Sequence, residues 1–171
     1  MVHSRISQPV QATFTRPADT TAYTIGDVIG PAVAAVQSFG PCVRSPGFGG
    51  RVTGVTLTKS DKSVTLTTFD LYLFHTAPAA IADNAEFLPT DAEILNLIGI
   101  IPMAAASFVQ SGGAANALNA VYHSSAVAQR PDILFQCASG SQTIYGVLVA
   151  RGAYVPVSGE VISILLHIEH D

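Results

Sequence analysis

The last twelve residues, EVISILLHIEHD, place a large aliphatic side chain at every second position. Ile162, Ile164, Leu166 and Ile168 share one side of this period-two pattern, which predicts a β-strand with one buried face. The other side mixes apolar and polar residues, which indicates that the second face is partly covered as well. A strand of this kind points to a fold built on β-sheets.

Further strands are predicted along the chain, because runs rich in Val, Ile, Thr, Leu, Phe and Tyr are bounded by turn residues. We expect a hairpin in which residues 51–58 and 66–75 are joined by the polar tip KSDKS. The strand that ends near Ala150 is expected to pair with the last strand across a turn at Ser158-Gly159. The remaining candidate strands lie at about 10–16, 117–124 and 131–139, with a short extended segment at 21–30.

One short helix is predicted at about residues 90–98. Thr90 would be its N-cap, Glu93 stands at the third helical position of a capping box, and Gly99 would end it. Asp91 and Glu93 then lie in the first turn, where the helix dipole favours negative charge.

The order of these elements predicts an all-β fold: a jelly-roll-like β-sandwich of short antiparallel strands, with one short helix. Seven to nine short strands, punctuated by 14 glycines and 10 prolines and without β-α-β alternation, favour that architecture over a parallel sheet. We expect residues 1–171 to form a single domain. Residues 1–9 are expected to be an extended arm that lies on a neighbouring subunit.

The surface is expected to carry few charges, because charged residues make up 12% of the chain against about 25% in an average soluble domain. We infer that partner subunits cover part of this surface, since interspersed charge is what keeps monomers apart. The net charge of −4 and the scattered basic residues argue against nucleic-acid binding. The apolar stretch 94–109 is sixteen residues long and contains Asn96, Gly99 and Pro102, so we expect no membrane span, and the first residues lack the apolar core of a secretory signal.

The acidic segment 83–93 is the one candidate ion site. Asp83, Asn84 and Glu86 do not follow the spacing of a calcium loop, and no glycine lies among them. The helix cap accounts for Asp91 and Glu93 without any ligand. Whether Asp83, Asn84 and Glu86 bind an ion or a neighbouring subunit stays open.

Other chemistry-bearing residues lack a recognisable pattern. His75 and His123 show no zinc spacing, and the SPGFGGR loop lacks the Lys-Ser/Thr that follows a phosphate-binding loop. Cys42 and Cys137 are one possible pair, with two buried free thiols as the favoured interpretation. No nucleophile elbow is present. We therefore expect no catalytic, cofactor-binding or metal-binding residues and no enzymatic activity.

Three stretches occur in order over Thr13 to Glu169: TFTRPADTTAYTIGDVIG, DLYLFHTAPAAIADNAEFLPTDAEILNLIGII and YGVLVARGAYVPVSGEVISILLHIEHD. Together they resemble structural proteins of tailed bacteriophages, of the head-decoration or cement kind. The resemblance implies a β-sandwich subunit, often a homotrimer, made in the bacterial cytoplasm. Such a subunit sits on the outside of the capsid, binds the major capsid protein and clamps neighbouring capsomers. It implies no active-site residues.

The sequence leaves two alternatives to a head decoration protein open. A tail or baseplate module that binds a receptor or glycan would need a stacking aromatic residue, for which Tyr122, Tyr145 and Tyr154 are the candidates. A hydrolase would need two carboxylates facing each other across a cleft, for example Asp83 and Glu160.

Overall fold

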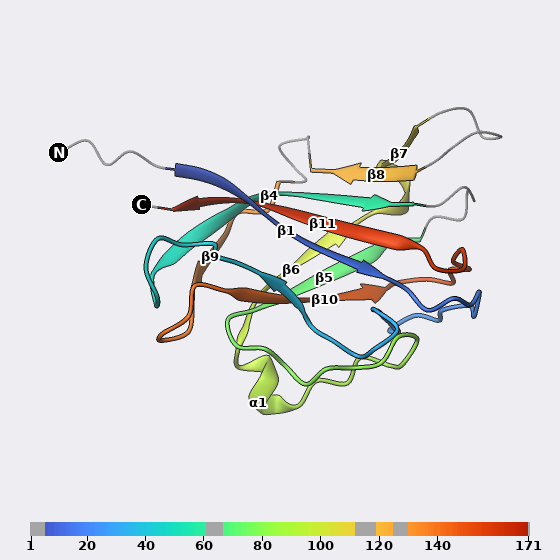
Figure 1. Ribbon diagram of the computed structural model, residues 1–171, viewed down its shortest axis with the longest axis horizontal. Helices are drawn as coiled ribbons and strands as arrows, with labels where there is room; N and C mark the ends of the chain where they lie inside the picture. Colours follow the sequence, from blue (N-terminus) through green and yellow to red (C-terminus); the bar gives the residue numbers. More distant parts are fainter. Residues whose placement is uncertain (1–5, 61–66, 112–118, 125–129, 171) are drawn as a thin grey trace.

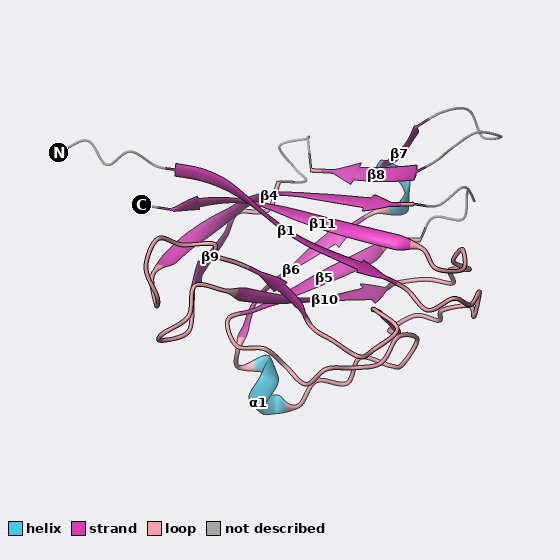
Figure 2. Cartoon of the chain, viewed as in Figure 1, coloured by secondary structure: helices cyan, strands magenta, loops and turns pink. Residues whose placement is uncertain are grey.

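The computed structural model describes residues 6–60, 67–111, 119–124 and 130–170, which form two antiparallel β-sheets packed face to face (Figures 1 and 2). In the first sheet the strand order is β1-β11-β4-β8-β7, and β9 pairs with β4 beside β8. Its strands are β1 (Ile6–Thr15), β11 (Val161–His170), β4 (Gly49–Lys59), β8 (Asn119–His123), β7 (Phe108–Ser111) and β9 (Ile133–Gln136).

In the second sheet the order is β2-β10-β5-β6, and β3 pairs with β10 beside β2. Its strands are β2 (Val28–Ile29), β3 (Gln37–Phe39), β10 (Ile144–Ala150), β5 (Phe69–Phe74) and β6 (Leu97–Met103). Two short helical turns, α1 (Asp91–Ile94) and η1 (Ala105–Ser107), complete the described elements.

The strand pairing is that of a jelly roll. The antiparallel pairs β1/β11, β3/β10, β4/β8 and β5/β6 nest inside one another along the chain, and successive pairs belong to different sheets. Nested strand pairs of this kind, which alternate between the two sheets, distinguish a jelly roll from a simple up-and-down sandwich. The predicted fold class is confirmed.

Both predicted hairpins are wrong. β4 lies in the first sheet and β5 in the second, and β10 and β11 are likewise in different sheets. β4 and β11 each have partners on both sides in the first sheet, and β5 and β10 do so in the second. Apolar side chains of all four strands fill the space between the sheets, so each strand gains more by a central place in its own sheet than by pairing with its neighbour in sequence.

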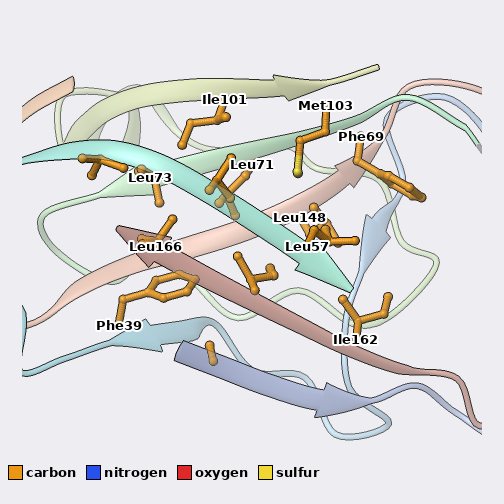
Figure 3. Close-up of a cluster of buried hydrophobic side chains, with 14 of the residues drawn as sticks. Phe39, Leu57, Phe69, Leu71, Leu73, Ile101, Met103, Leu148, Ile162 and Leu166 are labelled. Atoms are coloured by element: carbon orange, nitrogen blue, oxygen red, sulfur yellow. The ribbon is translucent and has the colours of Figure 1, made fainter. Parts of the chain in front are cut away.

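The core between the sheets is built by alternate residues of the central strands (Figure 3). The side chains Ile162, Ile164, Leu166 and Ile168 of β11 are fully buried, as the period-two pattern predicts. They pack in one cluster with residues from both sheets, among them Phe39, Leu57, Phe69, Leu71, Leu73, Ile101, Met103 and Leu148.

The helix begins as predicted but ends early. Thr90 accepts from the Glu93 backbone N–H while the Glu93 carboxylate accepts from the Thr90 backbone N–H, so the capping box is confirmed. Instead of continuing to residue 98, the chain enters β6 at Leu97, because Ile101 and Met103 are buried in the core when the segment pairs with β5. Gly99 does not end the helix; it lies in β6, where an added Cβ would come within 3.1 Å of Ile133.

The N-terminal arm is shorter than predicted, because residues 6–9 belong to β1 and pair with β11 of the same chain. Val10 and Phe14 are buried, and the Gln8 side chain donates to the Pro41 carbonyl at 2.9 Å. Pro9 is compatible with this strand because β1 lies at the edge of the sheet, where one side of the backbone forms no ladder bonds. Residues 1–5 of the predicted arm lie outside the described residues.

The acidic segment belongs to a third layer that covers the outer face of the second sheet, and we call it the covering layer. Ile81 and Phe87 pack against Phe74, Val147 and Val149 in a second apolar cluster. Figure 1 shows this layer, with α1 at its lower end, below β10. The segment is therefore placed by burial of its apolar residues.

Leu166→Ala should lower the free energy of unfolding by about 3 kcal/mol, because it removes buried methyl groups and leaves a cavity between the sheets. Leu165→Ala is the matched control, since the neighbouring side chain lies on the opposite face and is only half-buried. Its cost should be about 1 kcal/mol or less. Urea denaturation measures both, and equal losses would contradict the assignment of faces.

Candidate functional site

The carboxylate of Asp83 is held entirely by groups of the same chain. Its Oδ2 accepts from Arg16 Nη2 at 2.9 Å, and its Oδ1 accepts from the Tyr23 hydroxyl at 2.5 Å and from the Gly30 backbone N–H at 2.9 Å. The Asp83 side chain is only 7% exposed and that of Arg16 is fully buried. Asp83 is therefore the counter-ion of Arg16.

Asn84 and Glu86 also connect the acidic segment to residues 22–30. Asn84 adopts a left-handed conformation with φ of 60°, and with its amide oriented to satisfy both partners it donates to Asp27 Oδ2 and to the Ala22 carbonyl. Backbone hydrogen bonds from Val28 N–H to Ala85 and from Asn84 N–H to Val28 join the two segments. Glu86 forms a backbone bridge to Asp27, and its side chain is exposed. Asp83 and Asn84 thus fasten this segment to residues 22–30 of the same chain.

A second buried ion pair lies close by. Lys59 Nζ is 3.2 Å from Glu160 Oε1, and the Tyr154 hydroxyl donates to Glu160 Oε2 at 2.5 Å. Both side chains of the ion pair are fully buried, and Lys59 Nζ also lies 4.1 Å from the centre of the Tyr154 ring. A buried charge needs such partners, because it has lost its water.

The two ion pairs join into one cluster, which we call the buried polar network: Arg16, Tyr23, Asp83, Lys59, Tyr154 and Glu160. The rings of Tyr23 and Tyr154 stack with centroids 5.7 Å apart, and the Arg16 backbone N–H donates to the Glu160 carbonyl at 2.9 Å. The network lies where β1 and β4 end and β11 begins, at the right of Figure 1. It connects loops from both ends of the chain to the covering layer.

The network does not have the geometry of a hydrolase. Asp83 and Glu160, the two carboxylates considered for that chemistry, each bind a different cation, and both side chains are buried. Burial and the hydrogen bond to Asp83 raise the pKa of Tyr23 well above its usual range. The phenol therefore stays a hydrogen-bond donor, which is the role that Asp83 requires.

The other residues named from the sequence are dispersed. Tyr122 and Tyr154, candidates for stacking on a glycan, are buried in the core, and Tyr145 is partly covered by the second apolar cluster. His123 lies on the outer face of the first sheet, where it contacts Thr56 and the ring of His167. Burial, followed by the charge interaction with His123, lowers the pKa of His167.

An open hollow of about 590 Å³ lies at the opposite end of the sandwich and is lined by residues of β4, β9 and β11. The start of β4, the end of β11 and β9 lie at the left of Figure 1. Phe48 and Leu134, 57% and 70% exposed, lie on its lining together with Arg51 and Glu169. Gly50 allows β4 to approach its neighbours closely, because an added Cβ would lie 2.9 Å from the Glu169 carbonyl and from the Phe135 ring. We call this the end hollow.

The end hollow could not be found from the sequence. The SPGFGGR motif runs into it, but the second wall comes from β9, more than eighty residues later. The available signal was the Gly49-Gly50 pair directly before the strand predicted at 51–58, because glycines in or beside a strand mark a close approach of the backbone.

Neither the protein-family models nor the curated proteins that were searched contain a match to this chain. Within the described residues, no cluster of three or more His, Cys, Asp and Glu side chains is arranged to hold a metal ion. A helix with the length and apolar character needed to cross a membrane is likewise not found in that part of the chain.

Asp83→Asn should lower the free energy of unfolding by about 3 kcal/mol, because it leaves the Arg16 charge buried without its counter-ion. Asp19→Asn is the matched control: Asp19 lies 3.9 Å from the same guanidinium, but its side chain is 45% exposed. That substitution should change the free energy of unfolding little, because an exposed ion pair is screened by solvent. Chemical denaturation of both variants is the measurement, and a small loss for Asp83→Asn would contradict the counter-ion role.

In the presence of a reductant, the free energy of unfolding should fall by about 2 kcal/mol between pH 8 and pH 10. Burial, followed by the neighbouring thiol, raises the pKa of Cys42 to about 12, whereas an unfolded cysteine ionises near pH 8.5. The contribution of this thiol is therefore complete below about pH 8.5 and is lost as the pH rises toward the folded pKa. Urea denaturation across this range should show a shallower fall for Cys42→Ala, and parallel curves would contradict this origin.

Proposed function

We propose that this chain is a non-enzymatic structural protein of a bacteriophage virion. In this proposal it is a head decoration or cement protein that binds the major capsid protein on the outside of the capsid and stabilises the contacts between capsomers. It would be made in the bacterial cytoplasm, assemble as a homotrimer and end in the virion. The sequence resemblance to such proteins is the starting point, and the character of the surface supports it.

The observation that carries the proposal is the number of large apolar side chains at the surface of a chain with few charges. Monomeric proteins rarely leave apolar side chains clustered and uncovered, whereas apolar, charge-depleted patches are typical of the centre of protein interfaces. Of the exposed apolar side chains, Phe48 and Leu134 share the lining of the end hollow. Those more than half exposed in the described residues include Ile25, Val33, Phe48, Leu88, Leu95, Val109 and Leu134.

The end hollow is the best candidate for one of these contacts. Phe48 and Leu134 offer apolar area on its lining, and the pair of Arg51 with Asp132, at 3.1 Å, supplies polar groups beside them. An apolar centre with a polar rim is the usual anatomy of an interface that holds two proteins together. Repeated over many capsid positions, even a modest contact of this kind gives strong binding.

The jelly roll supports the proposal without deciding it. Viral capsid domains use this architecture, but so do lectins and other proteins. The glycan-binding alternative loses two of its three predicted stacking residues, because Tyr122 and Tyr154 lie in the core, and the third, Tyr145, is partly covered by the second apolar cluster. No feature of the described surface favours that alternative over a structural role.

The purified protein should form a trimer and bind expanded heads of the phage that encodes it. Light scattering coupled to gel filtration gives the oligomeric state, and co-sedimentation with heads that lack the protein gives the binding. A protein that stays monomeric and binds neither expanded nor unexpanded heads would contradict the proposal.

Leu134→Ser should weaken binding to heads, or trimer formation, about tenfold, which corresponds to the loss of one well-packed interface side chain. Leu88→Ser is the matched control, because Leu88 is 69% exposed and Leu134 is 70% exposed, while Leu88 lies in the covering layer away from the end hollow. The same dissociation constant for Leu134→Ser as for the unchanged protein would remove the end hollow as a contact. Equal weakening by both substitutions would show that the effect is not specific to it.

A further inference from the structure

The sulfur atoms of Cys42 and Cys137 face each other inside the protein. Their Sγ atoms are 3.6 Å apart, and both thiols are free and buried. Cys42 follows β3 of the second sheet, and Cys137 follows β9 of the first. The contact therefore spans the two sheets.

The backbone around both residues is held in place. The Cys42 N–H donates to the Gln142 carbonyl at 2.8 Å, and the Cys137 N–H donates to the Phe48 carbonyl at 3.0 Å. The Gln142 side chain in turn donates to the Val43 carbonyl at 2.7 Å. These bonds tie the segments that carry the two thiols to each other, and the sequence contains no third cysteine that could compete for either one.

We propose that Cys42 and Cys137 are a modification site: they form a reversible intramolecular disulfide that clamps the two sheets together when the protein meets an oxidising environment. The inference is independent of the proposed function, since it rests on the thiol pair alone. It assigns the oxidant to the class of low-molecular-weight disulfides, of which oxidised glutathione is the example used below.

The chemistry is ordinary thiol–disulfide exchange. One cysteine loses its proton to solvent and attacks a sulfur of the small disulfide, which forms a mixed disulfide and releases one small thiolate. The second cysteine then loses its proton and displaces the other small thiolate from the first cysteine sulfur. The two cysteines are oxidised by two electrons in total, the small disulfide is reduced to two thiols, and the two protons end on those thiols.

The same burial makes the reaction slow near neutral pH. Burial raises the pKa of Cys42 and of Cys137, so that only a small fraction of either thiol is ionised there. The rate of closure should increase about tenfold for each pH unit between pH 7 and pH 9, in proportion to the thiolate fraction. Such a site stays reduced during brief exposure and closes during long exposure.

Closure should stabilise the fold strongly, because the two cysteines are 95 positions apart and a long loop loses much of its freedom in the unfolded state. We expect the melting temperature of the oxidised protein to exceed that of the reduced protein by about 10 °C.

The test is to incubate the folded protein with excess oxidised glutathione at pH 8.5 and to compare it with protein kept in dithiothreitol. We expect an intact mass lower by two hydrogen atoms, a Cys42–Cys137 cross-link in the non-reduced peptide map, and a higher melting temperature that the reductant reverses. Cys137→Ala is the control and should gain only a bound glutathione or no modification. Because the main comparison uses the unchanged chain, it does not depend on the folding of a variant.

Three results would overturn the inference: two free thiols after an incubation that fully oxidises the urea-unfolded protein, stable glutathione adducts on the cysteines without closure, or a disulfide that leaves the melting temperature unchanged.

Discussion

The burial of two positive charges constrains this structure more than any other single feature. The Arg16 and Lys59 side chains are fully buried, and each would destabilise the fold severely without a carboxylate at hand. Asp83 comes from the covering layer and Glu160 from the turn before β11, so satisfying the two cations positions two segments that are far apart in the sequence. The stacked rings of Tyr23 and Tyr154 connect the two pairs.

This requirement explains the acidic segment. Its residues have the composition of an ion site, but each acidic side chain that is not exposed has an identified structural partner: Asp83 with Arg16, and Glu93 with the backbone of Thr90 and Ala79. The apolar residues between them, Ile81 and Phe87, pack on the second sheet. The segment is therefore the third layer of the sandwich, and the question of an external ligand is reduced to the exposed side chains of Glu86 and Asp91.

The sequence predicted local features well and long-range ones poorly. Alternation identified β11 and its buried face, and the Thr90–Glu93 capping box identified the start of α1, because both depend on residues close together in the chain. The assignment of strands to sheets failed for β4 and β5 and for β10 and β11, since it depends on which strands share the core rather than on which are adjacent in sequence. The partnership of Arg16 with Asp83, 67 positions apart, carries no local signal at all.

The proposal of a role in a virion is supported by the apolar side chains that stay exposed at the surface. Exposed apolar side chains such as Phe48 and Leu134 remain available for contacts with other subunits.

The stability of the fold depends on Arg16 and Asp83 acting as a pair. A double-mutant cycle with Arg16→Met and Asp83→Leu tests this directly by denaturation of the four proteins. The predicted result is a coupling free energy of about 2 kcal/mol, with the double variant more stable than the two single losses imply. Additive losses would contradict it.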